Sequence, residues 1–196
     1  MLRKSLAVLL CSCAAAFSAQ ADDVELALTE ETLQGTYITD GSMVGLGGSD
    51  LSLGLLFSDD RDIVLNAGLM VPGLGEDGMG GDVMPGPITV RFGAKAFGAL
   101  LADPSDDIFA IAPGVEARYA IPTGIPLAAV ANFFYSPDIL TFGNAEDVFD
   151  FNVRLEAQFV ERATGFVGFR RLSFDRDGGG DDDIVEHIQV GVRFAF

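Results

Sequence analysis

The chain has 196 residues, of which 49% are hydrophobic, and its 29 acidic and 12 basic residues give a formal net charge of −17. Such an excess of acid excludes a basic surface that could hold the phosphates of nucleic acid. Beyond residue 21 the apolar runs are too short for a membrane-spanning helix, so the hydrophobic content must be distributed in another way.

The first residues have the features of a secretory signal peptide. A basic start precedes an apolar stretch that ends at Phe17, and small residues stand at Ala19 and Ala21, the two positions that a signal peptidase reads. This pattern predicts a signal peptide over residues 1–21, cleaved after Ala21, and a mature barrel domain over residues 22–196. We therefore expect the protein to be exported to the cell outer membrane.

Both cysteines of the chain, Cys11 and Cys13, lie inside this leader. An alternative interpretation is a lipoprotein leader in which Cys13 is lipidated, although Cys11 fits that pattern poorly. With cleavage after Ala21, the exported domain has neither a disulfide nor a free thiol.

After the leader, the hydrophobic pattern has a period of two, which is typical of strands rather than helices. Between Phe149 and Phe159 every odd-numbered residue is apolar and every even-numbered residue is polar. Turns rich in Gly, Pro and Asp separate the alternating segments. In chain order the clearest segments are 24–28, 32–39, 51–58, 63–71, 88–95, 109–121, 149–159 and 184–196.

We count eight strands from Leu51 to Phe196 and two more before Leu51. The fold class predicted is all-β, a closed antiparallel transmembrane β-barrel of about ten strands, with eight as the alternative. Closure leaves no unpaired sheet edge in lipid. The apolar set would face lipid, and in the last segment this set is Ile184, Ile188, Val190, Val192, Phe194 and Phe196. A soluble barrel or sandwich with this set facing inward is the competing hypothesis.

The links between strands predict the topology. With the C-terminus in the periplasm, the short links at 122–126 and 161–165 lie on the inner side. The acidic loops at 102–107, 138–147 and 175–183 then lie outside. The stretch 72–87 conflicts with this asymmetry, because it is long and rich in glycine but falls on the inner side.

The end of the chain predicts how the barrel is assembled. Gln189, Gly191, Phe194 and the C-terminal Phe196 form an alternating strand that resembles the assembly signal of outer-membrane proteins. The expected partners are the outer-membrane insertion machinery and periplasmic chaperones during assembly, and then outer-membrane lipids and lipopolysaccharide. We expect a monomer that binds no nucleic acid.

Several segments resemble the YfaZ family of outer-membrane proteins. The segment Asn132–Leu140, followed by Phe142–Ala145, is similar to the central signature of that family. Gly168–Leu172 and Val190–Phe194 are also similar, but such pieces are common to many barrels. The resemblance implies a small porin-like barrel without an established activity, and it provides no catalytic or binding residues.

A charged set falls on the face that the alternation turns inward. Its members are Arg91, Lys95, Glu116, Arg118, Asp150, Arg154, Glu156, His187 and Arg193. We interpret the set as a lumen charge network that fills a narrow barrel with ion pairs, because an interior of this size is just wide enough for side chains. The alternative is a narrow passive channel for small solutes or ions, in which the set forms a selectivity ring.

The sequence gives little support for other chemistry. The sole histidine, His187, and the hydroxyl of Ser173 are the candidates for an outer-membrane lipid or peptide hydrolase, but nothing marks Ser173 as activated. The stretch Asp175–Glu186 faintly resembles a calcium loop, yet its fifth position is glycine and strands flank it. We therefore predict no catalytic residues, no metal site and no cofactor.

Overall fold

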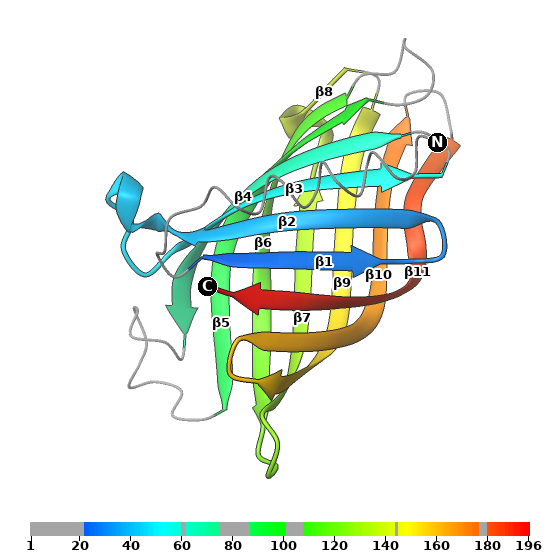
Figure 1. Ribbon diagram of the computed structural model, residues 1–196. Helices are drawn as coiled ribbons and strands as arrows, with labels where there is room; N and C mark the ends of the chain where they lie inside the picture. Colours follow the sequence, from blue (N-terminus) through cyan, green and yellow to red (C-terminus); the bar gives the residue numbers. More distant parts are fainter. Residues whose placement is uncertain (1–21, 60–61, 75–86, 101–107, 144, 177–179) are drawn as a thin grey trace.

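The two-residue alternation folds as strands throughout the chain, as the computed structural model in Figure 1 shows. The structure describes residues 22–59, 62–74, 87–100, 108–143, 145–176 and 180–196. The predicted signal peptide, with its cleavage residues Ala19 and Ala21, lies outside the described residues.

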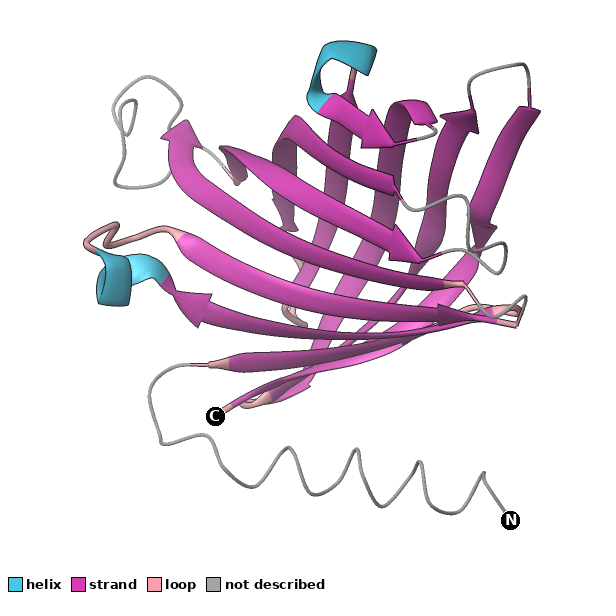
Figure 2. Cartoon of the chain, turned by 90° about the horizontal axis from the view of Figure 1, so that it is seen from above, coloured by secondary structure: helices cyan, strands magenta, loops and turns pink. Residues whose placement is uncertain are grey.

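The strands match the segments expected from the sequence. They are β1 (Asp23–Leu28), β2 (Thr32–Asp40), β3 (Asp50–Ser58), β4 (Ile63–Leu74), β5 (Ile88–Leu100), β6 (Ile108–Ile121), β7 (Leu127–Ser136), β8 (Thr141–Gly143), β9 (Ala145–Val160), β10 (Ala163–Arg176) and β11 (Gly180–Ala195). Two short 3-10 helices, η1 (Gly41–Val44) and η2 (Asp138–Leu140), interrupt them. Figure 2 shows both helices at the rim, outside the ring of strands.

The sheet closes on itself. Neighbouring strands pair antiparallel along the chain, β5 pairs with β6, and β1 pairs with β11. β8 pairs with β6 in continuation of β7, while β7 pairs with β9 on its other side, so the wall has ten strand positions. The prediction of a closed barrel of about ten strands is confirmed, and the alternative of eight is wrong because β1 and β2 belong to the wall.

The interruption between β7 and β8 is held by local hydrogen bonds. The hydroxyls of Ser136 and Thr141, both buried, lie 2.9 Å apart across η2. The Leu140 amide donates to the Pro137 carbonyl at 2.8 Å. Because Pro137 has no amide hydrogen, a strand cannot continue to pair through it, and the chain loops out before it rejoins β6.

The outer face of the wall is apolar. On β9, Val153 and Leu155 are 40% and 44% exposed, whereas Arg154 and Glu156 between and beyond them are buried. Among the described residues, no helix is long and apolar enough to cross a membrane. The exposure of Val153 and Leu155 shows that they point away from the lumen, as expected for a wall whose solvent is lipid.

We call the end of the barrel that holds Phe196 the inner end. The Phe196 amide donates to the Asp22 carbonyl and the Ala195 amide to the Arg162 carbonyl, each at 3.0 Å. At the same end the Gln158 amide donates to the Pro126 carbonyl at 3.0 Å. The links at 122–126 and 161–165 thus lie beside the C-terminus, while most of 72–87 falls outside the described residues.

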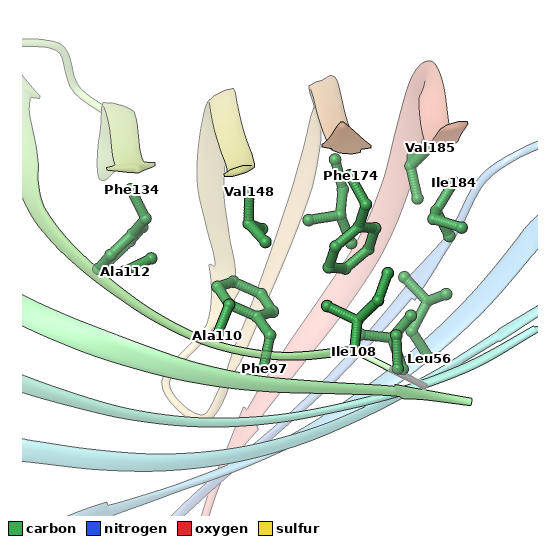
Figure 3. Close-up of a cluster of buried hydrophobic side chains, with 13 residues drawn as sticks. Leu56, Phe97, Ile108, Ala110, Ala112, Phe134, Val148, Phe174, Ile184 and Val185 are labelled. Atoms are coloured by element: carbon green, nitrogen blue, oxygen red, sulfur yellow. The ribbon is translucent and has the colours of Figure 1, made fainter. Parts of the chain in front are cut away.

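The lumen at the outer end is filled by apolar side chains. We name this cluster the apolar plug; its members, each at most 7% exposed, are Leu56, Val64, Phe97, Ala99, Ile108, Ala110, Ala112, Phe134, Val148, Leu172, Phe174, Ile184 and Val185. Figure 3 shows Phe134, Val148 and Phe174 projecting from one wall toward Phe97 and Ile108 on the opposite wall. The rings of Phe97 and Phe174 meet edge to face, with 6.5 Å between their centroids.

The plug corrects one assignment. Ile184 was expected on the outward face with Ile188 and Val190, but only 7% of Ile184 is exposed and it packs in the plug. The register between β10 and β11 shifts after the pair of Leu172 and Val185, so a bulge inserts an extra residue there. A bulge reverses the alternation beyond it, and Ile184 therefore joins Val185 inside.

Candidate functional site: the lumen charge network

The inner half of the lumen is polar. It encloses a cavity of about 150 Å³ between the charged residues of β5, β6, β9, β10 and β11 and the neutral polar residues of β2, β3 and β4. The neutral side is lined by Gln34, Thr36, Ser52 and Asn66. The strand alternation directs these side chains inward, so one side of the cavity is charged, while the other side, apart from Asp50 on β3, presents mainly amides and hydroxyls.

Asp150 lies at the boundary between the plug and the cavity. Only 2% of its surface is exposed, and its carboxylate accepts from Lys95 Nζ at 2.9 Å and from Arg170 Nε at 3.1 Å. Lys95 Nζ also lies 4.1 Å from the centroid of the Phe134 ring, which belongs to the plug. Arg170 donates further to the Gln34 side-chain carbonyl. A carboxylate so deeply buried requires both cations to offset the loss of water.

A second set of pairs surrounds Glu25 on β1. Its two carboxylate oxygens accept from Arg154 at 2.9 Å and from Arg193 at 2.7 Å. Arg154 and Arg193 also approach Glu156, at 2.9 and 3.7 Å, and Glu156 accepts from Arg118 at 2.5 Å. These five residues link β1, β6, β9 and β11, so the pairs connect opposite sides of the barrel.

The third set joins β5 to β3 and β6. Arg91 Nη1 donates to Asp50 at 2.5 Å and lies 3.8 Å from Glu116. With its amide nitrogen turned toward the carboxylate, Asn132 donates to Glu116 at 2.8 Å. The Arg91–Asp50 pair joins β5 to β3, so the neutral wall is also tied to the charged one.

Most residues of the predicted network therefore meet in the lumen, but His187 does not. Its Nε2 lies 2.9 Å from Glu31 in the link between β1 and β2, at the outer end, and both side chains are partly exposed. His187 shares the inward face with Gln189 and lies on β11 between Gln189 and the plug residue Val185, but it is not among the residues that line the cavity. The group that faces Nε2 of His187 is the Glu31 carboxylate, and not a hydroxyl that could act as a nucleophile.

The residues of the predicted assembly signal form part of the wall. Gln189 is 2% exposed, and its side-chain amide donates to Oδ1 of Asn152 at 2.9 Å, while Phe194 and Phe196 are exposed on the outer face. A Cβ at Gly191 would lie 2.3 Å from the Phe166 ring and 2.4 Å from the Leu26 carbonyl, so only glycine fits. These positions follow the predicted alternation, and their recognition by assembly factors stays a prediction.

Three members of the network were not predicted from the sequence, namely Glu25, Asp50 and Arg170. The signal for Glu25 was present, because Val24, Leu26 and Leu28 on either side of it point outward. Arg170 was hidden by its neighbour Arg171, since two adjacent arginines do not reveal which of them faces inward.

A second cavity, of about 390 Å³, lies at the inner end against the link between β6 and β7. It shares Arg118 and Glu156 with the polar cavity, and Thr123, Gln158 and Thr164 also line it. The polar half of the lumen is therefore approached from the inner end. Toward the outer end it stops at the plug.

The structure adds no metal site to this picture. Among the described residues, no three His, Cys, Asp or Glu side chains gather so that they could hold a metal ion. The centre of the faint calcium loop, residues 177–179, lies outside the described residues, so that alternative is untested.

Comparison with known proteins gave a family and distant structural likenesses. The family model described as "YfaZ precursor" matches residues 1–196. Among proteins with curated descriptions, none matches.

Three solved structures illustrate the likeness. A "bacterial polysaccharide outer membrane secretin" is 9% identical with a TM-score of 0.48, covering 89% of this chain and 69% of its own. The "KdgM porin in complex with disordered oligogalacturonate" is 10% identical with a TM-score of 0.46, covering 90% and 99%. The "outer membrane channel DcaP of Acinetobacter baumannii" is 12% identical with a TM-score of 0.43, covering 88% and 54%.

Proposed function

Because this chain belongs to the YfaZ family and folds as a closed barrel, we propose that it is a structural or interaction protein of the outer membrane whose lumen is closed to solutes. The apolar plug carries this proposal. Its side chains extend from one wall to the other at the outer end. Six of them are fully buried at 0% exposure: Val64, Ala110, Ala112, Val148, Leu172 and Phe174.

A layer of this kind opposes both water and ions. Hydrophobic constrictions in channels close by losing their water, and an ion that enters one must give up its hydration without a replacement. The charged residues below the plug do not form an open ring. They pair with one another instead. The distances are 2.9 and 3.1 Å from Asp150 to Lys95 and Arg170, and 2.7–2.9 Å between Glu25, Arg154, Arg193 and Glu156. The apolar plug and the paired charges below it therefore both favour a filled lumen over a conducting one.

The second candidate is a narrow passive channel. The observation that favours it is the polar cavity, which is approached from the inner end and would admit small solutes as far as Phe134. Conduction would then require the plug to rearrange. A hydrolase is less favoured, because His187 lines neither of the two cavities.

Export and partners complete the proposal. The predicted leader would deliver the chain to the outer membrane, where insertion machinery and periplasmic chaperones act on its final strand. Lipids and lipopolysaccharide would then surround a monomer. The apolar outer face, with Leu53, Leu65 and Phe92 each about half exposed, supports this environment.

Single-channel recording in planar bilayers tests the closed lumen. We expect the wild-type barrel to show no discrete openings. The double substitution Phe97→Ala and Phe174→Ala removes the ring pair that crosses the plug, and we expect it to produce discrete openings. The matched control is Phe109→Ala and Phe142→Ala, a ring pair on the outer face with 6.1 Å between centroids, which should stay silent. Openings in the wild-type protein would contradict the proposal and favour the channel.

A further inference from the structure

The wall has one stretch where a strand lacks a neighbour. β11 has 16 residues, whereas β1, which flanks it on one side, has six. Their pairing ends with Leu28 and Val190, after which the chain turns toward β2. Figure 1 shows β11 continuing beyond the end of β1 with β10 beside it. We call the part of β11 that precedes Val190 the free edge.

The register shows which backbone groups face the free edge. The Ala195 amide donates toward β10, to the Arg162 carbonyl, and the Phe196 amide donates toward β1, to the Asp22 carbonyl. In an antiparallel ladder these directions alternate, so even-numbered residues of β11 direct their amides and carbonyls toward the β1 side. At Val190 these groups meet Leu28. At Ile188 and Glu186 they meet no strand within the described part of the chain.

Three amides of the nearby turn are used locally: the Thr29 hydroxyl accepts from the amides of Glu31 and Thr32 at 3.3 and 2.9 Å, and the Thr29 amide donates to the Thr32 carbonyl at 2.9 Å. A side-chain pair, His187 and Glu31, joins this turn to the free edge. Within the described part of the chain, no backbone hydrogen bond connects the turn with Ile188 or Glu186.

The charges on this part of the wall favour water over hydrocarbon as its surroundings. Glu186 is exposed on the outer face, and Arg171 lies opposite it on β10. Outward charges are costly in the hydrocarbon layer, and unpaired backbone groups are not tolerated there. Ile188 is nevertheless 70% exposed and Val190 51% exposed, which provides an apolar strip beside the open backbone.

The surroundings of the free edge are acidic. The turn between β1 and β2 carries Glu30 and Glu31, and the Asp59 amide donates to the Glu31 carbonyl at 2.9 Å, which brings a third carboxylate to the same corner. Glu30, Glu31 and Asp59 are exposed. Among the described residues around the edge, the positive groups are Arg171 and, when protonated, His187, so the carboxylates outnumber them.

We propose that the free edge of β11 binds an extended, positively charged peptide segment, which pairs with Ile188 and Glu186 as an additional strand. Main-chain hydrogen bonds give such strand addition its affinity, and alternate side chains of the peptide give its specificity. Apolar side chains of the segment would cover Ile188 and Val190, and basic ones would meet Glu30, Glu31 and Asp59. A second copy of this chain is a poorer occupant, because it would bring the same carboxylates against themselves.

The experiment uses the refolded barrel in lipid vesicles and a fluorescent Lys-Val repeat peptide of about eight residues, a usual strand length. Fluorescence anisotropy at low salt should report binding that weakens as salt rises. A Glu-Val repeat of equal length should not bind. The same Lys-Val peptide with alternate amides N-methylated keeps its charge but cannot pair on its methylated edge, and it should bind at least about tenfold more weakly, which corresponds to 1.4 kcal/mol.

The variant Ile188→Pro tests the same point from the side of the barrel. Proline removes the amide hydrogen that faces the free edge and leaves the pairing with β10, which uses odd-numbered residues, in place. We expect a similar loss of peptide affinity, whereas Ile188→Val, which keeps the amide, should bind as the wild type does. Absence of binding, equal binding of the N-methylated peptide, or a dimer cross-linked through residue 188 would each overturn the proposal.

Discussion

On β9, Val148 is fully buried among apolar side chains of the plug, whereas Asp150, two positions along on the same face, is buried among cations. The change of chemistry takes place over a single inward step. Phe134 marks the boundary on the neighbouring strand, with the plug on one side of its ring and Lys95 Nζ on the other. The alternation thus decides which residues face the lumen. The position along the strand decides whether the lumen is filled by apolar or by charged side chains.

The two halves differ in how their parts depend on one another. Each plug side chain contributes through its own buried area, roughly 1.5–3 kcal/mol for a full-sized apolar residue. In the polar half each ion is tolerated only because its partners are present, so the removal of one ion leaves others unpaired. Substitutions in the polar half should therefore have the larger effects.

The largest effect is expected at Asp150. Substitution of Asp150 by Ala leaves Lys95 and Arg170 without their shared carboxylate, and breaking a buried pair costs about 3–5 kcal/mol. Urea unfolding in vesicles, followed by the heat-modifiable mobility of the barrel, measures the change. The control is Asp147→Ala on the same strand, whose carboxylate accepts a hydrogen bond from the exposed Tyr135 hydroxyl at 3.2 Å and should matter little. Equal effects of the two variants would contradict the dependence of the lumen on Asp150.

The next effect compares an inward leucine with an outward one. Leu172→Ala opens a hole in the plug, and such substitutions cost about 2–5 kcal/mol. Leu155→Ala on the outer face loses contact area with lipid but leaves no hole, because mobile acyl chains close over it, so about 1–2 kcal/mol is expected. The difference in the free energy of unfolding between the two variants measures the packing of the plug. A larger loss at Leu155 would show that the plug is loosely packed.

The alternation of apolar and polar residues was enough to predict most of the fold. The segment 149–159 predicted both faces of β9 correctly, because every inward residue there is polar and every outward one apolar. Where both faces are apolar, that contrast disappears. Ala110 and Ile111 are neighbours on β6, one in the plug and one exposed, and composition alone does not tell them apart. The plug therefore became visible only once the walls were placed opposite each other.

The network was predictable in membership but not in pairing. Parity placed Arg118 and Glu156 inside, yet their contact joins residues far apart in the chain and depends on how the barrel closes. Glu25 pairs with Arg193 only because β1 meets β11. The bulge that moved Ile184 inward has no marker in the sequence. Closure and local register are tertiary properties, and a repeating pattern of two residues does not contain them.

The smallest effect is expected at the interruption between β7 and β8. Ser136→Ala removes the hydroxyl that lies 2.9 Å from that of Thr141, but Thr141 still donates to the Pro137 carbonyl at 3.2 Å. Since no buried donor is left without an acceptor, the loss should be about 0.5–1.5 kcal/mol in the free energy of unfolding. Thr141→Val removes both hydrogen bonds at constant volume and should cost more. A larger loss in the free energy of unfolding for Ser136→Ala than for Thr141→Val would contradict this expectation. The wall would then depend on Ser136 rather than on the return of the chain at Thr141, and β8 would not be a true continuation of β7.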